Sequence, residues 1–201
     1  MNAEQHLVLH GLGIKKYAKA DAIASLLDLP LERVTQVLKD AVSRGSVIDM
    51  DGRYTLAPTA RVSLQANHGR FNAALRSNGA FRSAYQEFER VNIELKGLIT
   101  DWQTIRIGGK TVPNDHSDEA HDEQVLDRLG RLHEQAEKIL KSLAAELPRM
   151  SVYLRKLEEA LDRAESGQIE WVSDAKIESY HTVWFELHED LLCLMGETRK
   201  E

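Results

Sequence analysis

The stretch from Ala20 to Leu56 places the tightest constraint on how this chain of 201 residues can fold. It contains two segments with apolar residues at helical spacing, separated by turn residues that end at Pro30. Proline is tolerated in the first turn of a helix, so the second segment is expected to begin at Pro30 or Leu31. Gly45 is expected to end it, because glycine readily takes positive φ at a helix terminus. The stretch therefore predicts two consecutive helices joined by a tight turn.

A hairpin is predicted directly after these helices. Residues 46–50 and 53–56 have the pattern of two short strands, and Asp51 and Gly52 between them form a two-residue turn signal. An earlier helix is predicted from Ala3 to Leu12, with Gly11 and Gly13 at its end. Helix, helix, helix and hairpin is the order of elements in a winged helix-turn-helix, with a boundary expected after residue 57.

The same region carries a resemblance to a known family. The residues that match are Ala22, Ile23, Ala24, Leu29, Pro30, Val34, Leu38, Gly45 and Val47, followed by the exit sequence Leu-Ala-Pro-Thr-Ala-Arg at 56–61. With these residues the first third of the chain resembles the winged helix of bacterial transcription regulators of the MarR type, although Ala60 stands where glycine is common. The resemblance implies a DNA-binding homodimer. The opening of the chain, from Leu9 to Ala18, is also similar to winged-helix segments that accompany PEP-utilising phosphotransfer enzymes.

The outward side chains of this region are candidates for DNA contact. If the helix that begins at Leu31 lies in a major groove, Arg33 can pair with guanine and Gln36 with adenine. Other basic or polar side chains on the helices and at the hairpin tip would contact phosphates or the minor groove. The full set of candidates is Lys15, Lys16, Lys19, Arg33, Thr35, Gln36, Lys39 and Arg53. The alternative is an ordinary exposed helix face, and Glu32 and Asp40 favour that alternative.

Charge is distributed unevenly along the chain, whose formal net charge is −6. Residues 1–65 contain eight Lys and Arg against seven Asp and Glu, and the remaining residues contain eighteen against twenty-five. Contacts of basic side chains with phosphates supply most non-specific DNA affinity. The small excess of basic residues over residues 1–65 is therefore in the region predicted to bind DNA. Because the excess is small, DNA binding would require a homodimer or a concentrated basic patch.

From residue 58 to residue 201 the pattern predicts an all-α helical bundle, so the fold class expected is mainly α. Helices are expected over 59–76, 80–106, 118–147, 150–166 and 175–196, with Ser117 as an N-cap and residues 107–117 as a loop. The apolar positions over 125–147 repeat at three and four residues and could form a seam with another helix, as a dimer would need. The single cysteine, Cys193, lies in an apolar run and is expected to be a buried structural thiol.

Two clusters in the bundle could bind a ligand. One would combine His181 and His188, two turns apart, with aromatic side chains; its members are Trp102, Tyr153, His181, Trp184 and His188. Its alternative is a set of histidines satisfied at a helix-packing seam. The other is an acidic cluster at a helix start, made of Asp115, His116, Asp118, His121 and Asp122. Carboxylates and imidazoles suit a divalent metal, but acidic residues at a helix start are also favoured by the helix dipole.

These observations predict a one-component transcription regulator that binds double-stranded DNA as a homodimer, with a possible small-molecule effector in the bundle. The alternative is a winged-helix accessory subunit that binds a protein partner, for example a PEP-utilising phosphotransfer enzyme. No phosphate-binding loop, nucleophile triad or metal signature is recognised, so no catalytic residue, cofactor or metal is predicted. A metal-dependent enzyme that uses the acidic cluster is the third hypothesis. A cytoplasmic protein without a membrane segment is expected.

Overall fold

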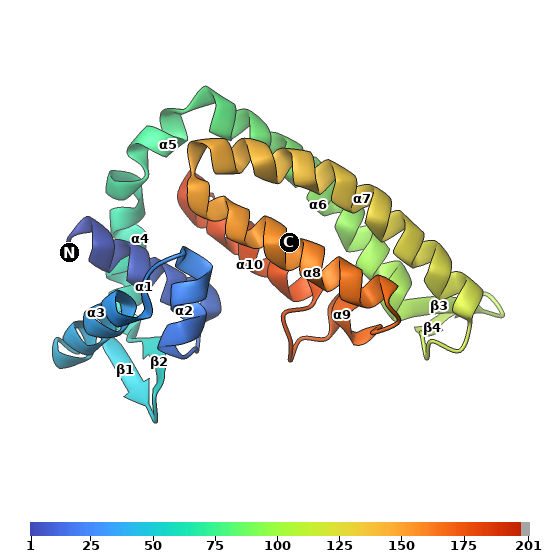
Figure 1. Cartoon of the computed structure of the whole chain (residues 1–201), viewed down its shortest axis with the longest axis horizontal. Helices are drawn as coiled ribbons and strands as arrows, with labels where there is room; N and C mark the ends of the chain where they lie inside the picture. The colour runs from blue at the N-terminus through green and yellow to red at the C-terminus, as the bar shows by residue number, and fades with distance from the viewer. Residues whose placement is uncertain (198–201) are drawn as a thin grey trace. The chain divides into compact units, whose positions relative to one another are not determined.

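The computed structural model describes residues 1–197 and is mainly helical (Figure 1). The chain forms two compact units: Met1–Gly79 with the residues from Glu186 onward, and Ala80–Phe185. Within residues 1–197 no helix combines the length and the apolar composition needed to cross a membrane. The division differs from the expected boundary after residue 57, because the next helix packs against the first helix of the chain and belongs to the same unit.

The first unit opens with three helices: α1 (Ala3–Lys15), α2 (Ala20–Leu27) and α3 (Leu31–Ser43). A capping box between Asn2 and Gln5 begins α1, where each side chain bonds the backbone of the other. The prediction that this helix ends at Gly11 and Gly13 is wrong, because α1 continues to Lys15. Gly11 instead allows close approach to α2, since a Cβ added there would lie 2.9 Å from Leu27 Cδ1.

The predicted hairpin is confirmed as β1 (Val47–Met50) and β2 (Arg53–Leu56), which pair antiparallel. Asp51 and Gly52 form its turn with φ values of 54° and 79°, the positive angles that a two-residue turn of this kind requires. Ala18, in the link between α1 and α2, exchanges backbone hydrogen bonds of 3.1 and 2.8 Å with Tyr54. The hairpin is therefore tied to the first two helices.

The core of the first unit also includes residues of α4 (Pro58–Phe71), notably Ala60 and Leu64. Asn72 then leaves helical geometry, with φ −108° and ψ 10°, and the short helix α5 (Ala73–Ser77) follows. The single helix expected over 59–76 is therefore interrupted. The last residues of α10 (Tyr180–Met195) complete this unit.

The second unit is a helical bundle. Its elements are α6 (Gly79–Gln103), α7 (Glu119–Glu146), a 3₁₀ turn at Pro148–Met150, α8 (Ser151–Glu165), α9 (Glu170–Ser173) and the first residues of α10. α7 and α8 pack against each other. Trp184 of α10 stacks on Phe88 of α6 at 4.8 Å between ring centroids, and its indole N–H donates to Asn92 Oδ1 at 3.0 Å.

A second hairpin replaces the loop expected over 107–117. β3 (Thr104–Ile107) pairs antiparallel with β4 (Lys110–Pro113), and Gly108 and Gly109 form the turn with φ values of 57° and 81°. Paired glycines between short runs that contain β-branched residues are a hairpin signal, and here this local signal prevails over the helical pattern that precedes it. The expected N-cap of α7 also differs, because Asp118 rather than Ser117 accepts from the backbone, at His121 N.

The last helix begins later than residue 175. Asp174 Oδ1 accepts from the backbone N–H of Lys176 at 2.8 Å, and Ser179 Oγ accepts from that of Thr182 at 3.3 Å. Asp and Ser side chains that bond nearby backbone groups favour turns and helix starts over helix interiors. α10 consequently begins at Tyr180.

A buried histidine makes the stability of the second unit dependent on pH. His133 contacts the Tyr180 hydroxyl through Nδ1 at 3.2 Å, and burial lowers its pKa below the usual value despite nearby carboxylates. As the pH falls, His133 therefore takes up a proton more readily in the unfolded chain than in the folded chain. The contribution of neutral His133 to stability is complete above the pKa of this histidine in the unfolded chain and is lost as the pH falls below that pKa. Between about pH 7 and about pH 5, urea unfolding should show a smaller loss of stability in His133→Gln than in wild type. Equal losses in both proteins would contradict this origin.

Candidate functional site

Four of the eight predicted DNA contacts lie on α3. Arg33, Gln36 and Lys39 are exposed, and Thr35 is half-buried. Arg33 Nε pairs with Glu4 Oε1 at 2.8 Å, while 65% of the arginine side chain stays accessible. Gln36 Nε2 donates to Asp40 Oδ1 at 2.9 Å. The structure therefore brings these side chains onto one accessible face, but carboxylates of the same unit hold two of them.

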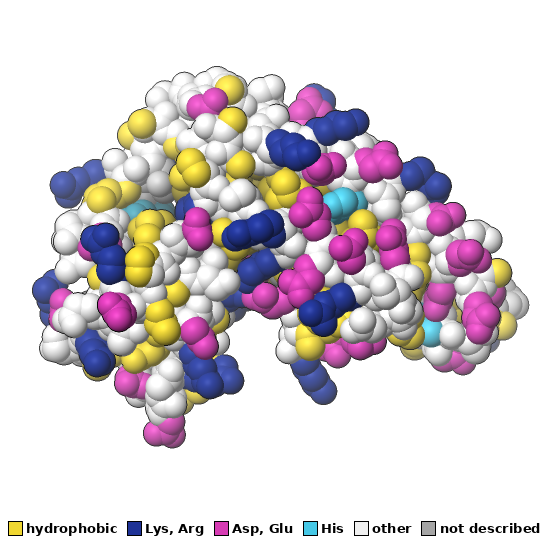
Figure 2. Space-filling model, viewed as in Figure 1, with side chains coloured by type: hydrophobic (Ala, Val, Ile, Leu, Met, Phe, Trp, Pro, Cys, Tyr) yellow, Lys and Arg dark blue, Asp and Glu magenta, His cyan; other side chains and the backbone are white. Residues whose placement is uncertain are grey.

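The tip of the first hairpin combines a cation with apolar side chains. Arg53 lies 5.5 Å from the centroid of the Tyr17 ring, in cation–π geometry. Tyr17, Ile48 and Met50 are 47%, 46% and 52% exposed. On the face drawn in Figure 2, basic, acidic and hydrophobic side chains are mixed over this unit rather than gathered by kind. The hairpin surface can thus offer both charge and apolar area.

The three predicted lysines that precede α2 differ in accessibility. Lys16 and Lys19 are exposed. Lys15 is not available in the same way, because its Nζ pairs with Glu186 Oε2 at 2.8 Å and only 9% of its side chain is accessible. Lys15 therefore joins α1 to the part of α10 that belongs to the first unit, a role that its sequence context did not indicate.

Three imidazole rings are packed together inside the first unit. His6 and His10 come from α1 and His68 from α4, and all three are buried. The ring centroid of His68 lies 5.1 Å from that of His6 and 5.4 Å from that of His10. Phe71 stacks on His6 at 4.4 Å. We call His6, His10 and His68 the histidine cluster.

The histidine cluster lies beside a cavity of about 480 Å³, lined in part by His10, His68 and Cys193. His10 Nε2 lies 2.8 Å from Asp190 Oδ1, and the aspartate is fully buried. A ring nitrogen of His10, a ring nitrogen of His68 and the Sγ atom of Cys193 all lie within 4.8 Å of one another. The site therefore joins α1, α4 and α10.

Burial controls the protonation of these groups. It lowers the pKa of both His6 and His68 to about 4, with a further contribution from the neighbouring imidazole of His10. Burial and then the Asp190 and Glu189 carboxylates raise the pKa of the Cys193 thiol to about 11. His6 Nε2 and His68 Nδ1 are buried and find no hydrogen-bond partner among the residues that the structure describes. At neutral pH the rings of His6 and His68 are uncharged.

Arg76 anchors the end of α10 next to this cavity. Its Nε donates to the carbonyl oxygen of Leu194 at 2.7 Å, and its Nη2 donates to that of Cys193 at 3.2 Å. A guanidinium at a helix C-terminus satisfies carbonyls that have no partner within the helix. These contacts hold Cys193 in place relative to α5.

The histidine cluster was not identified from the sequence. His6 and His10 are four residues apart, which places them on one face of α1 and is a usable signal. His68 and Cys193 are distant along the chain, so only tertiary packing brings them to that face. The expectation that Cys193 is a buried thiol holds in part, because the side chain is partly accessible.

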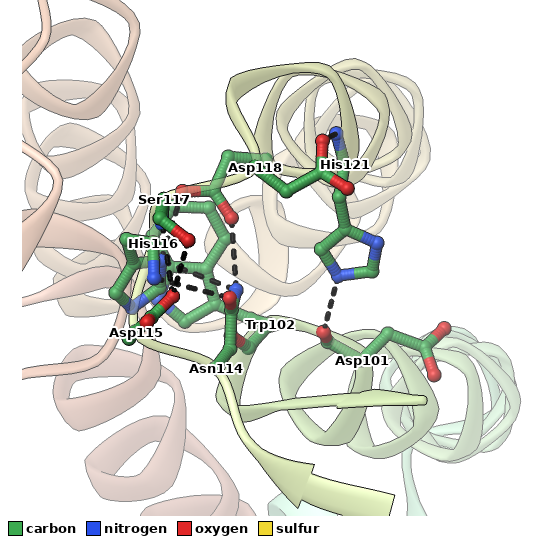
Figure 3. Close-up of polar contacts among 9 residues, drawn as sticks. Asp101, Trp102, Asn114, Asp115, His116, Ser117, Asp118 and His121 are labelled. Atoms are coloured by element: carbon green, nitrogen blue, oxygen red, sulfur yellow. Dashed lines mark hydrogen bonds and ion pairs between the residues drawn. The ribbon is translucent and has the colours of Figure 1, made fainter. Parts of the chain in front are cut away.

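The acidic cluster has structural roles (Figure 3). His116 Nδ1 contacts Asp122 Oδ2 at 2.9 Å, and Asn114 Nδ2 donates to Asp122 Oδ1 at the same distance. His121 Nε2 contacts the carbonyl oxygen of Asp101 at 2.9 Å, while Asp118 caps α7. These contacts join the segment after β4 to the start of α7, and the start of α7 to the end of α6, so most of the side chains proposed for a metal already have partners.

The three aromatic candidates for a ligand site are all buried. Trp102 packs against His116 at 4.6 Å between ring centroids, next to the second hairpin. Trp184 packs against Phe88 and Tyr180, and Tyr153 is fully buried. His181 is half-buried and lies in the second unit, whereas His188 is buried in the first. The packing of Trp102 and Trp184 is that of core residues.

Comparisons of the chain with protein-family models, with curated proteins and with solved structures found no match. Two places in the first unit have side-chain chemistry that suits a functional site. One is the exposed face formed by α3 and the first hairpin, and the other is the histidine cluster with its cavity.

Proposed function

We propose that the protein is a DNA-binding transcription regulator of the one-component type, whose first unit acts as a winged helix. The observation that carries the proposal is the exposed face of α3 followed by a hairpin with Arg53 at its tip. The backbone pairing of Ala18 with Tyr54 supports it, because it fixes the hairpin relative to the helices that it would accompany onto DNA. The resemblance of residues 22–61 to MarR-type regulators implies the same role.

In this proposal the N-terminal half of α3 enters the major groove. Arg33 and Gln36 would then read base edges, Thr35 and Lys39 would contact phosphates, and Arg53 would contact the adjacent backbone or minor groove. The ion pair of Arg33 with Glu4 is exposed, and such pairs contribute only about 0–1 kcal/mol. Exchange of that carboxylate for a phosphate or a guanine is therefore inexpensive.

A homodimer is part of the proposal. The nearly balanced charge of residues 1–65 would give one copy weak affinity for DNA, and two copies double the phosphate contacts. The second unit would supply the dimer contacts. An effector that bound one arrangement of the dimer more tightly would shift the population and change DNA affinity.

We expect Arg33→Ala and Arg53→Ala each to weaken binding to duplex DNA from the upstream region of its own gene by about 1–3 kcal/mol. Binding would be measured by fluorescence anisotropy over a series of salt concentrations. Loss of a phosphate contact should lower the salt slope by about 1, whereas loss of a base contact should reduce discrimination between this DNA and an unrelated duplex.

Arg128→Ala is the matched control. Arg128 is a half-exposed arginine of the second unit, paired with Asp101 at 2.7 Å, so its removal changes net charge equally without touching α3 or the hairpin. The proposed interface would be ruled out if all three substitutions had equal effects. It would also be ruled out if the wild-type protein bound DNA no more tightly than an unrelated acidic protein.

A protein partner is the second candidate for the same surface. The exposed apolar side chains of Tyr17, Ile48 and Met50 favour it, because apolar area around a hairpin suits a protein interface better than a phosphate backbone. The protein would then be an accessory subunit. Ile48→Glu should abolish such an interaction and leave binding to DNA through Arg33 intact.

A further inference from the structure

The site lies between α1, α4 and the end of α10, where side chains from three distant parts of the sequence meet. His10 and His68 each bring a ring nitrogen, and Cys193 brings a thiol, with the three atoms within 4.8 Å of one another. Two imidazoles and a thiol are ligands that transition metals prefer, whereas Mg²⁺ and Ca²⁺ prefer oxygen.

We propose that His10, His68 and Cys193 bind a transition-metal ion, Zn²⁺ being the ion of choice, with Asp190 as the residue that orients His10. This inference does not depend on DNA binding. Zinc takes tetrahedral sites of nitrogen and sulfur at bond lengths of about 2.0–2.3 Å, which places ligand atoms about 3.5 Å apart. Ligand atoms up to 4.8 Å apart would need to approach by about 1 Å, which side-chain rotation can supply.

The contact of His10 with Asp190 has the arrangement expected beside a metal. A carboxylate accepts, so His10 Nε2 carries the hydrogen at 2.8 Å from Asp190 Oδ1, which leaves Nδ1 as the ring nitrogen that can bind a metal. Metal-bound histidines commonly donate their other N–H to a carboxylate, which orients the ring and increases its basicity. In its ionised form the Asp190 carboxylate would also offset the net positive charge of a Zn²⁺ thiolate.

The unsatisfied nitrogen of His68 is an independent reason to expect a ligand. His68 is 8% exposed, and its Nδ1 has no hydrogen-bond partner among residues 1–197. Leaving a buried polar atom unpaired costs free energy that an apolar side chain at this position would not cost. A metal bound to His68 Nδ1 would remove that cost.

The cavity gives the metal an open side. Three protein ligands leave a fourth tetrahedral position, which water or a small anion can occupy within the space of about 480 Å³. Arg76 also lines this cavity and would favour an anionic ligand there. Binding replaces the thiol proton by the metal, so Cys193 becomes a thiolate and one proton is released to solvent.

The test uses the full chain and the metal alone. The purified protein would be stripped with a chelator, titrated with Co²⁺ and read by absorption, then dialysed against Zn²⁺ and analysed for metal. We expect about one metal per chain, a thiolate-to-cobalt charge-transfer band, and loss of that band in Cys193→Ser. His68→Gln should weaken binding more than Asp190→Asn, for which about 10–100-fold is expected with the band retained.

His121→Gln is the matched control, because His121 is a histidine of the second unit outside the histidine cluster. It should bind Co²⁺ like wild type, and circular dichroism would establish that each variant is folded. A wild-type protein that retains no Zn²⁺, or a cobalt spectrum that is unchanged by Cys193→Ser, overturns the proposal. Either result leaves the DNA-binding proposal intact, since that proposal is tested on α3 and the hairpin.

Discussion

Asp190→Ala is expected to lower the free energy of unfolding of the first unit by about 3 kcal/mol. Asp190 is fully buried and accepts from His10 Nε2 at 2.8 Å, so its removal leaves a buried N–H without that acceptor and a gap next to α1. Asp190 also belongs to the end of α10, and its loss weakens the attachment of that helix to α1. Hydrogen exchange of α1 amides, in the presence of a chelator, would measure the effect.

Asp190→Asn is the control for this prediction. It keeps the volume and an acceptor oxygen but removes the charge, so we expect a loss of roughly 1 kcal/mol, less than for alanine. Faster exchange should be confined to the first unit. Wild-type protection of α1 in Asp190→Ala would show that the contact with His10 contributes little to folding.

Trp184→Ala is expected to destabilise the second unit by about 3–5 kcal/mol. The side chain is 2% exposed, stacks on Phe88 and lies 6.1 Å from the Tyr180 ring between centroids, so alanine leaves a large cavity between α6 and α10. Trp102 and Trp171 lie in the same unit, and their fluorescence during urea unfolding reports its stability. We expect the urea midpoint of Trp184→Ala to be lower than that of the wild-type protein.

Trp184→Phe separates packing from hydrogen bonding. Phenylalanine retains most of the stacking on Phe88 but cannot donate to Asn92 Oδ1, so a loss of about 1–3 kcal/mol is expected. Trp184→Phe combined with Asn92→Leu should recover part of that loss, because no buried polar atom is then left unpaired. A double variant no more stable than the single one would contradict the assigned role of the hydrogen bond.

Local signals in the sequence were sufficient for the elements from residue 20 to residue 56. Pro30, Gly45 and the pair Asp51 and Gly52 act on the backbone of their own neighbours, so their effects do not depend on distant contacts. The second hairpin carried an equally local signal in Gly108 and Gly109, which the loop assignment missed.

Apolar periodicity predicted the bundle helices but not all of their ends. The pattern over 59–76 continues through Asn72, and that over 175–196 continues through Ser179, because periodicity records which face is apolar and not where backbone hydrogen bonds stop. Side-chain bonds made by Asp174 and Ser179 decide the start of α10. Such bonds compete with the helix over only a few residues, and a periodic pattern does not register them.

From the residues alone one could derive a mainly helical chain, the first hairpin and an exposed polar face on the helix after Pro30. Only the tertiary structure brought His68 and Cys193 to the face of α1 that carries His10, and only it paired Lys15 with Glu186. Secondary structure follows from interactions between residues close in sequence, whereas these contacts join residues more than fifty positions apart. Their formation depends on which helix faces pack together, and no spacing in the sequence records that choice.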